Sequence, residues 1–327
     1  MKQNNLKPDM ISDLLKPASA NLDVFAEAMA ELATQNKNIL AVTSDSRGSG
    51  KLTGFGEQFP GQLVEVGIAE QNLVGVAAGL SSTGKKVFAV SPACFLTTRS
   101  LEQIKNDVAY SREPVVLVGI SAGVSYGALG STHHSLHDAA VLRAIPNIRI
   151  IVPADNFEAR QAVLVAANSD IPVFLKFGKK PMPDLPRPDK QFEIGKASVI
   201  CQGEDVAFIA CGETVAPAYE AALLLQQEGF VAEVISMHTL KPLDHQAVID
   251  TAKKCKAVIT VEEHSVHGGL GEACASLLMQ EGISVRFRII GIPDEDTVTG
   301  SQTEIFNHYG ISGQGLSKTA LTLMKKD

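Results

Sequence analysis

Tryptophan is absent from this chain of 327 residues, and aromatic residues of all kinds make up only 5% of it. Proteins that bind single-stranded nucleic acid stack the bases on aromatic side chains, so this composition disfavours such a surface. An excess of basic residues is also lacking, because the formal net charge is -7, whereas nucleic-acid-binding surfaces are basic. No apolar run approaches the roughly 18 residues of a membrane span. Composition therefore disfavours nucleic-acid-binding and membrane-spanning proteins.

Cysteine is scarce and scattered, with five residues and no CxxC pair. This pattern excludes a disulfide framework and offers no metal-binding spacing, so we expect buried, reduced thiols and no metal site on this chain. Residues 1–16 are polar and lack the apolar core of a secretory signal. We therefore expect a cytoplasmic protein. The cysteines are Cys94, Cys201, Cys211, Cys255 and Cys274.

Short β-branched runs alternate with segments of helical periodicity along most of the chain. Such alternation is typical of parallel α/β units, whose buried strands are continuous apolar runs. The first series has strand candidates at 39–43, 63–66, 86–90, 115–120, 148–152 and 172–177, with helices at 22–33, 69–80, 100–110, 136–144 and 156–167. The second has strands at 206–210, 231–235, 257–261 and 285–289, with helices at 216–227, 245–255 and 270–279.

Four prolines interrupt this alternation between residues 178 and 189. Proline fits neither a helix interior nor a central strand, so we predict an interdomain linker near residues 179–190. The predicted architecture is α/β, with two open, mostly parallel α/β/α domains at residues 20–180 and 191–327.

Glu70 stands at a strand-to-helix transition in the run VGIAEQNLVG. Ligands of open α/β sheets bind beyond the carboxyl ends of the strands, and an ionisable group in an apolar setting is a functional candidate. A carboxylate in the first turn of a helix also favours the positive end of the helix dipole. The residues alone leave both interpretations open.

A glycine-rich segment, SYGALGSTHHSLHD, places His133, His134 and His137 just before Asp138. It lacks the pair of histidines four residues apart on a helix, with a flanking glutamate, that marks a zinc protease. Histidines that donate protons or hydrogen bonds to a polar substrate fit better, because their pKa lies near neutrality. Alternatively, Ser135 caps the next helix with Asp138 at its third position.

Two further segments are weaker candidates. Phe95, in CFLTTRSLEQI, has the usual character of a core residue. The run EEHSVHGGLG, residues 262–271, has glycines at a helix start that could cradle an anion. We favour a tight turn and close helix packing there, because a lone glycine-rich turn is weak support for a site.

Taken in order, several motifs resemble the C-terminal half of a transketolase, and equally the corresponding half of deoxyxylulose-phosphate synthase. The resemblance spans roughly residues 20 to 325, and several motifs in one order are more specific than any single one. It implies a pyrimidine-binding domain at 20–180 and a transketolase C-terminal domain at 191–327. The motifs are VGIAEQNLVGVAAGL, FLTTRSLEQI, GSTHHSLHD, IPNIRIIVPAD, DVAFIACGETVAPAYEAA, KPLD and VEEHSVHGGLG.

The cofactor implied by this resemblance is thiamine diphosphate, held between two chains together with Mg²⁺. In the family, a separate domain with a Gly-Asp-Gly signature and a downstream Asn holds the diphosphate and the metal. No Gly-Asp-Gly occurs in this sequence. The chain therefore resembles one subunit of a split transketolase, and we expect a diphosphate-binding partner subunit, with two copies of each.

The resemblance also implies roles for single residues. Glu70 matches the catalytic glutamate that hydrogen-bonds the ring nitrogen of the aminopyrimidine and so assists proton removal from the reactive thiazolium carbon. Phe95 matches the aromatic residue that stacks on the pyrimidine, and Arg99 is a cationic candidate at the same cofactor site. His133 matches the catalytic loop histidine that contacts substrate hydroxyls.

The chain departs from the family at Leu129, where the matching motif carries an aspartate. Leucine cannot accept a hydrogen bond from a sugar hydroxyl, so the usual preference for pentose and hexose phosphates is in doubt. His134 and His137 are candidates for replacement contacts. Lys179 stands nearest to the family's phosphate-binding arginine, and Arg47 is a further cationic candidate for substrate binding, although a lysine lacks the two-pronged donor geometry of arginine.

The favoured function is transfer of a two-carbon ketol unit from a ketose to an aldose phosphate. The first alternative is the β subunit of a 2-oxo acid dehydrogenase-type decarboxylase, which shares the fold and the catalytic glutamate. Deoxyxylulose-phosphate synthase fits less well because it is normally one fused chain. A non-catalytic subunit that only binds a partner is an alternative of a different class.

Overall fold

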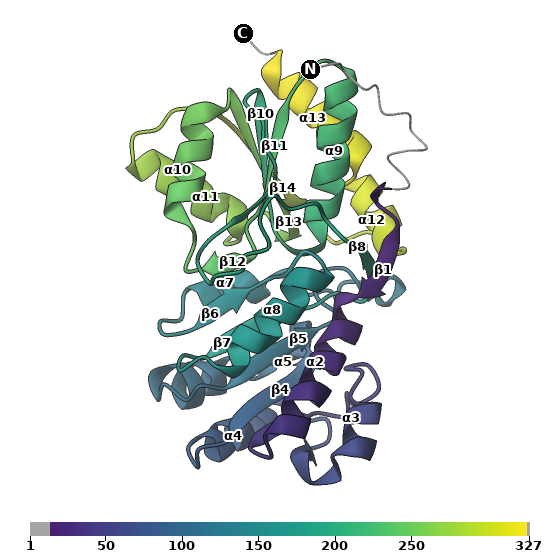
Figure 1. Ribbon diagram of the computed structural model, residues 1–327, viewed down its shortest axis with the longest axis vertical. Helices are drawn as coiled ribbons and strands as arrows, with labels where there is room; N and C mark the ends of the chain where they lie inside the picture. Colours follow the sequence, from purple (N-terminus) through teal and green to yellow (C-terminus); the bar gives the residue numbers. More distant parts are fainter. Residues whose placement is uncertain (1–13, 326–327) are drawn as a thin grey trace.

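Two α/β domains follow one another in the computed structural model, which describes residues 14–325 (Figure 1). Most of the polar segment 1–16 lies outside the described residues, as do residues 326–327. Within the described residues, no helix is long and apolar enough to cross a membrane. The predicted α/β class with two mostly parallel sheets is confirmed.

The first domain is built on a seven-stranded sheet with strand order β12-β6-β7-β5-β4-β2-β3. All of its neighbouring strands are parallel except β12, which runs antiparallel to β6. The strands are β2 (Ile39–Thr43), β3 (Leu63–Glu65), β4 (Lys86–Pro92), β5 (Val116–Ile120), β6 (Arg149–Ile151), β7 (Val173–Lys176) and β12 (Thr239–Lys241). The helices are α2 (Asn21–Gln35), α3 (Thr53–Gln58), α4 (Glu70–Ser81), α5 (Ala93–Arg99), α6 (Leu101–Gln103), the π-helix η2 (Ile104–Tyr110), α7 (Asp138–Arg143) and α8 (Asn156–Ala167), with short 3₁₀ turns η1 (Pro60–Gln62) and η3 (Gly127–Leu129).

The second domain has a five-stranded sheet with strand order β14-β13-β10-β11-β9, in which only β9 is antiparallel. Helices cover both faces of this sheet, α10 and α11 on one side and α9, α12 and α13 on the other (Figure 1). The strands are β9 (Ser198–Cys201), β10 (Val206–Ala210), β11 (Ala232–Ser236), β13 (Ala257–Ser265) and β14 (Arg286–Ile292). The helices are η4 (Gly212–Thr214), α9 (Val215–Gln227), α10 (His245–Lys254), α11 (Leu270–Gln280), α12 (Gln302–His308) and α13 (Gly313–Met324).

Two connections tie the domains together more closely than the sequence indicated. The predicted linker contains a short strand, β8 (Pro181–Pro183), which pairs with β1 (Pro17–Ala20) in a separate two-stranded sheet. Proline is tolerated there because this sheet has no central strand. In addition, β12 follows the strands of the second domain in sequence but completes the first sheet.

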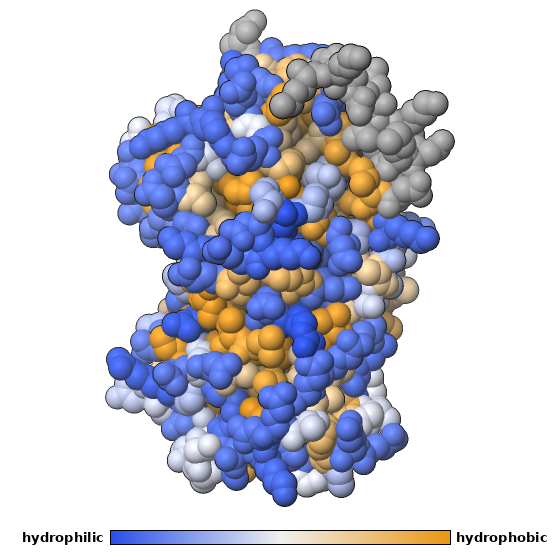
Figure 2. Space-filling view, viewed as in Figure 1, coloured by the Kyte–Doolittle hydropathy of each residue, from blue (hydrophilic) through white to orange (hydrophobic). Residues whose placement is uncertain are grey.

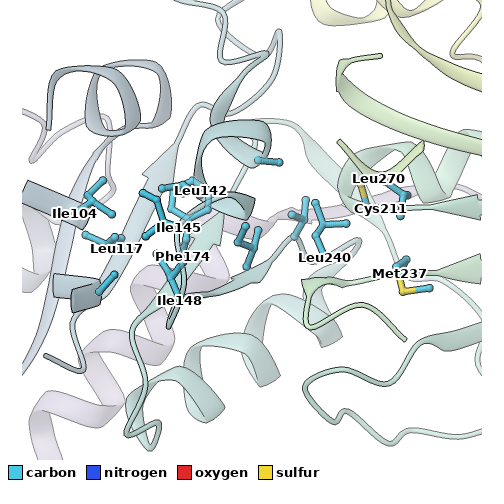
Figure 3. Close-up of a cluster of buried hydrophobic side chains, with 14 of the residues drawn as sticks. Ile104, Leu117, Leu142, Ile145, Ile148, Phe174, Cys211, Met237, Leu240 and Leu270 are labelled. Carbon is cyan, nitrogen blue, oxygen red and sulfur yellow. The ribbon is translucent and has the colours of Figure 1, made fainter. Parts of the chain in front are cut away.

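One hydrophobic cluster runs through both domains (Figure 3). It includes Leu117 and Phe174 from the first sheet, Met237 just before β12 and Leu240 within it, and Leu270 from the second domain. Four of the five cysteines are buried, Cys201 is partly buried, and all five are free thiols, as predicted. The continuous core means that the domains share packed surfaces, so residues of the second domain can reach the ligand-binding edge of the first.

Candidate functional site

The predicted site residues follow four parallel strands of the first sheet, of which β7, β5 and β4 are neighbours and β3 is separated from β4 by β2. Glu70 opens α4 after β3, Phe95 lies in α5 after β4, and His133 lies in the loop after β5. Lys179 follows β7. The carboxyl ends of parallel strands meet at one edge of a sheet, which is where open α/β proteins bind ligands.

Glu70 is buried, with 4% of its surface exposed, and both of its carboxylate oxygens accept hydrogen bonds from Arg99 Nη1 at 2.9 Å. The Arg99 side chain is 47% exposed. A surface cavity of about 540 Å³ is lined by residues 68–72 and Arg99. Glu70 therefore stands both in the first turn of a helix and at the wall of a cavity, and its catalytic role stays a prediction.

Arg99 also covers the ring of Phe95, with its guanidinium carbon 4.2 Å from the ring centre. The guanidinium is thus a planar group that lies on Phe95 and donates hydrogen bonds to Glu70. Sequence reasoning placed Arg99 near this site but did not predict its pairing with Glu70.

Further ring contacts connect Phe95 to His133 and Lys179, the residues predicted to bind the substrate. The His133 ring lies edge-on to Phe95 and to Tyr126, at 5.3 Å between ring centres in each case. Lys179 Nζ lies 4.8 Å from the centre of the Tyr126 ring. The structure therefore brings Glu70, Phe95, Arg99, His133 and Lys179 into one row of contacts. Sequence reasoning missed Tyr126, although an aromatic residue in a glycine-rich loop just before the histidines was the available signal.

Two other candidates have local structural partners. Arg47 donates to the carbonyl oxygen of Thr53 at 3.2 Å and packs on the backbone of α3. His134 is buried, its Nε2 lies 3.0 Å from the carbonyl oxygen of Gly127, and burial lowers its pKa. These contacts anchor both side chains, and their roles in substrate binding stay predictions.

The predicted capping arrangement at Ser135 is wrong. Helix α7 begins at Asp138 itself, and Ser135 Oγ donates to Asp138 Oδ2 at 2.8 Å instead of capping the helix. The physical reason is the buried ammonium of Lys176, whose Nζ lies 2.9 Å from Asp138 Oδ1. Burial alone would raise the pKa of Asp138, but the charge of Lys176, the nearby His264 and the hydrogen bonds from Lys176 and Ser135 together hold this pKa below its usual value.

The glycine-rich turn at residues 268–271 packs closely against the carboxylate of Glu262, in agreement with the predicted tight turn and close helix packing. Glu262 accepts hydrogen bonds from the backbone N–H groups of Leu270 at 2.7 Å and Gly271 at 2.8 Å. A side chain at Gly269 would collide with Glu262. The start of α11 is therefore occupied by Glu262. In residues 14–325, no group of three or more His, Cys, Asp or Glu side chains is placed to hold a metal ion.

Buried carboxyls of the second domain give a testable dependence of stability on pH. Burial raises the pKa of Glu213 and Glu262 to about 7 and that of Glu263 to about 8, from 4.5. Between pH 7 and 8 the folded chain keeps protons on these carboxyls that the unfolded chain has lost, while the histidines of the unfolded chain, with an ordinary pKa near 6.5, are largely neutral. Stability is then expected to fall as pH rises, by on the order of 1 kcal/mol per pH unit for each carboxyl that stays protonated.

Urea unfolding of the purified chain across this range checks the expectation. Glu263→Gln cannot lose a proton at this position, so its stability should depend less steeply on pH than that of the wild type. Wild-type stability that is constant or rises from pH 7 to 8 would contradict the assignment.

Comparison with known proteins identifies the family. Residues 18–183 match the family described as "Transketolase, pyrimidine binding domain", and residues 195–316 match "Transketolase, C-terminal domain". The chain is 48% identical to one subunit of the apulose-4-phosphate transketolase of Phocaeicola vulgatus, over 92% of this chain and 96% of that protein. It is 34% identical to a 6-deoxy-6-sulfo-D-fructose transketolase subunit of a Clostridium species, over 91% and 92%.

A solved structure agrees with these matches. The structure described as "Split gene transketolase, inactive beta4 tetramer" superposes with a TM-score of 0.84 at 34% identity, over 94% of this chain and 99% of that one. These findings favour a transketolase over the alternative of a 2-oxo acid decarboxylase subunit. The chain belongs to the transketolase family, as the subunit of a split, thiamine-diphosphate-dependent transketolase that carries the pyrimidine-binding and C-terminal domains.

Proposed function

We propose that this subunit, together with a separate diphosphate-binding subunit, transfers a two-carbon ketol unit from an anionic ketose to an aldose phosphate. The observation that carries the proposal is the buried Glu70 carboxylate at a cavity wall, in contact with Arg99, which in turn lies on Phe95. We also propose that the two domains span residues 20–180 and 191–327, and that the protein is cytoplasmic.

The residues present fit the aminopyrimidine of thiamine diphosphate. That ring needs an aromatic face and a carboxyl group for its nitrogen, and Phe95 and Glu70 supply these two groups. The planar guanidinium of Arg99 already makes both kinds of contact, because it donates a hydrogen bond to Glu70 and lies on the ring of Phe95. Because Arg99 is half-exposed, it can move aside and bind at the edge of the site.

Within this arrangement each residue has one task. The Glu70 carboxyl shares a proton with the pyrimidine nitrogen, and Phe95 orients the ring. The cofactor, when bound, supplies the carbon nucleophile that carries the ketol unit. His133 hydrogen-bonds substrate hydroxyls from the loop after β5, and Lys179, close to Tyr126, attracts the distal anion of the sugar. His134 and Arg47 are secondary candidates for substrate binding.

A partner subunit completes the proposed site. Mg²⁺ and the diphosphate require the Gly-Asp-Gly segment, which this sequence lacks. Ile68, two residues before Glu70, is 74% exposed and lines the same cavity, where the partner subunit would cover it. Hydrophobic patches also show in both domains on the face in Figure 2. We propose two copies of each subunit, because a cofactor held between chains needs a large interface and twofold symmetry is the commonest arrangement.

The substrate is tested at Leu129, which is 56% exposed in the loop that carries His133. In the reconstituted two-subunit enzyme, Leu129→Asp should raise activity on ordinary ketose phosphates relative to other ketoses, because aspartate accepts hydrogen bonds from sugar hydroxyls. Ketol transfer is measured with ketose phosphates, ketose sulfonates and branched ketose phosphates for both enzymes. An unchanged ranking of donors would contradict the role of Leu129, and no transfer from any ketose by the wild type would contradict the proposed function.

A further inference from the structure

The loop that carries Tyr126 and His133, residues 122–135, is closed at its base and fixed from the second domain. The backbone N–H of Ser135 donates to the carbonyl oxygen of Gly123 at 2.7 Å, which joins the two ends of the loop. Next to this closure, the backbone N–H of Val124 donates to Glu263 Oε1 at 2.8 Å. Glu263 lies on β13, which belongs to the other domain.

The contact between Glu263 and the loop is tight. Gly123 has a φ of +59°, which side chains rarely tolerate, and a Cβ atom there would lie 2.2 Å from the Glu263 carboxyl carbon. Glycine is therefore needed both for the backbone conformation and for the approach of Glu263. Farther along, a side chain at Gly127 would meet the carbonyl oxygen of Gly300 at 2.9 Å, so the loop also rests on the segment before α12.

A single amide holds Glu263 in this position. Gln302 Nε2 donates to Glu263 Oε1 at 2.8 Å and to Glu213 Oε2 at 2.7 Å. Glu213 in turn packs against Gly178, where a Cβ atom would lie 1.9 Å from its Oε1. Gly178 directly precedes Lys179. The three buried side chains Glu213, Glu263 and Gln302 therefore contact two backbone segments, the loop that carries His133 and the segment that carries Lys179.

We propose that Glu263 is a positioning residue that fixes the His133 loop for substrate binding, and that Gln302 holds Glu263 in place for this task. The second domain then takes part in the reaction through the loop, without touching the cofactor or the substrate. Glu263 replaces the hydrogen bond that water would otherwise make to Val124, and it anchors the backbone at one end of the loop. This inference rests on the proposed function, in which His133 contacts the substrate.

The test compares Glu263→Ala with Glu262→Ala in the full chain. Both residues are buried glutamates on β13, but Glu262 binds the start of α11 instead of the loop. Hydrogen exchange of peptides from residues 122–135 should become faster in Glu263→Ala than in Glu262→Ala. In the reconstituted enzyme, Glu263→Ala should lower kcat/KM for the ketose by roughly 10–100-fold, the scale of a small misplacement of a reacting group.

Glu263→Gln keeps an oxygen that can accept from Val124, so it should restore slow exchange in the loop and most of the activity. If Glu263→Ala does not fold, Gln302→Ala decides, with faster loop exchange and lower kcat/KM expected. Loop exchange and kcat/KM equal to those of Glu262→Ala, or of the wild type for Gln302→Ala, would overturn the positioning role. A wild-type complex without ketol transfer would instead contradict the proposed function, whereas the exchange comparison would still report on the contact.

Discussion

Glu70→Gln is expected to reduce ketol transfer by the assembled enzyme by roughly 10²–10⁴-fold, the scale of a lost general acid–base function. Glutamine keeps the shape of the side chain and one hydrogen-bond acceptor, but it cannot share a proton with the pyrimidine nitrogen. Glu70→Ala should be at least as severe, because it also leaves a polar ring nitrogen without a partner in a buried position. The measurement is steady-state turnover at saturating cofactor.

Glu272→Gln is the matched control for the helix dipole. Glu272 also stands in the first turn of a helix, α11, and accepts a hydrogen bond from the backbone N–H of Gly268. A first-turn carboxylate contributes typically about 0.3–1 kcal/mol to stability through the dipole. If Glu70 had only this structural role, both variants would lose a little stability and keep wild-type turnover, a result that would remove Glu70 from the mechanism.

The second large effect concerns the partner subunit. The purified chain should fold and show no ketol transfer on its own, because it provides the pyrimidine side of the site without the Gly-Asp-Gly segment for the diphosphate and Mg²⁺. Activity should appear when the diphosphate-binding subunit, thiamine diphosphate and Mg²⁺ are all added. A coupled assay on the chain, the partner and their mixture measures this.

Omission of Mg²⁺ or thiamine diphosphate from the mixture is the control, and each omission should abolish the activity. Ketol transfer by this chain without its partner would contradict the split-subunit account. Inactivity of the mixture with a partner that forms a stable complex would contradict it as well.

Local patterns predicted the transition that carries Glu70, but not α5, which carries Phe95 and Arg99, because the helix there was expected at 100–110. The helix predicted at 156–167 matches α8, and Glu70 lies at the predicted strand-to-helix transition. These features depend on apolar periodicity within about a dozen residues, which single-sequence reasoning can evaluate. The resemblance to transketolases then supplied the roles, since chemistry alone left Glu70 equally compatible with a helix-dipole function.

The contacts that complete the site depend on residues far apart in the chain. Arg99 pairs with Glu70 across 29 positions, and Glu263 reaches Val124 across 139. The alternation of side chains along β13 explains why neighbouring glutamates have different partners, since Glu262 faces α11 and Glu263 faces the loop. No local pattern predicts which element lies opposite each face, so these contacts required the structure.

Local sequence patterns also do not predict that β12 joins the first sheet. A strand of three residues gives little periodic signal, and its pairing with β6 depends on how the second domain packs on the first. The prolines of the predicted linker were read correctly as unsuited to a central strand, yet β8 pairs with β1 in a sheet that has only two strands.

Hydrogen–deuterium exchange at the reactive thiazolium carbon of thiamine diphosphate, in the assembled complex, tests most directly whether Glu70 of this subunit acts on the cofactor. The exchange reports proton removal from that carbon and does not depend on which sugar is the substrate. The account predicts fast exchange in the wild-type complex and exchange slower by roughly 10²–10⁴-fold in Glu70→Gln, with the cofactor still bound. Exchange at the wild-type rate in Glu70→Gln would contradict it.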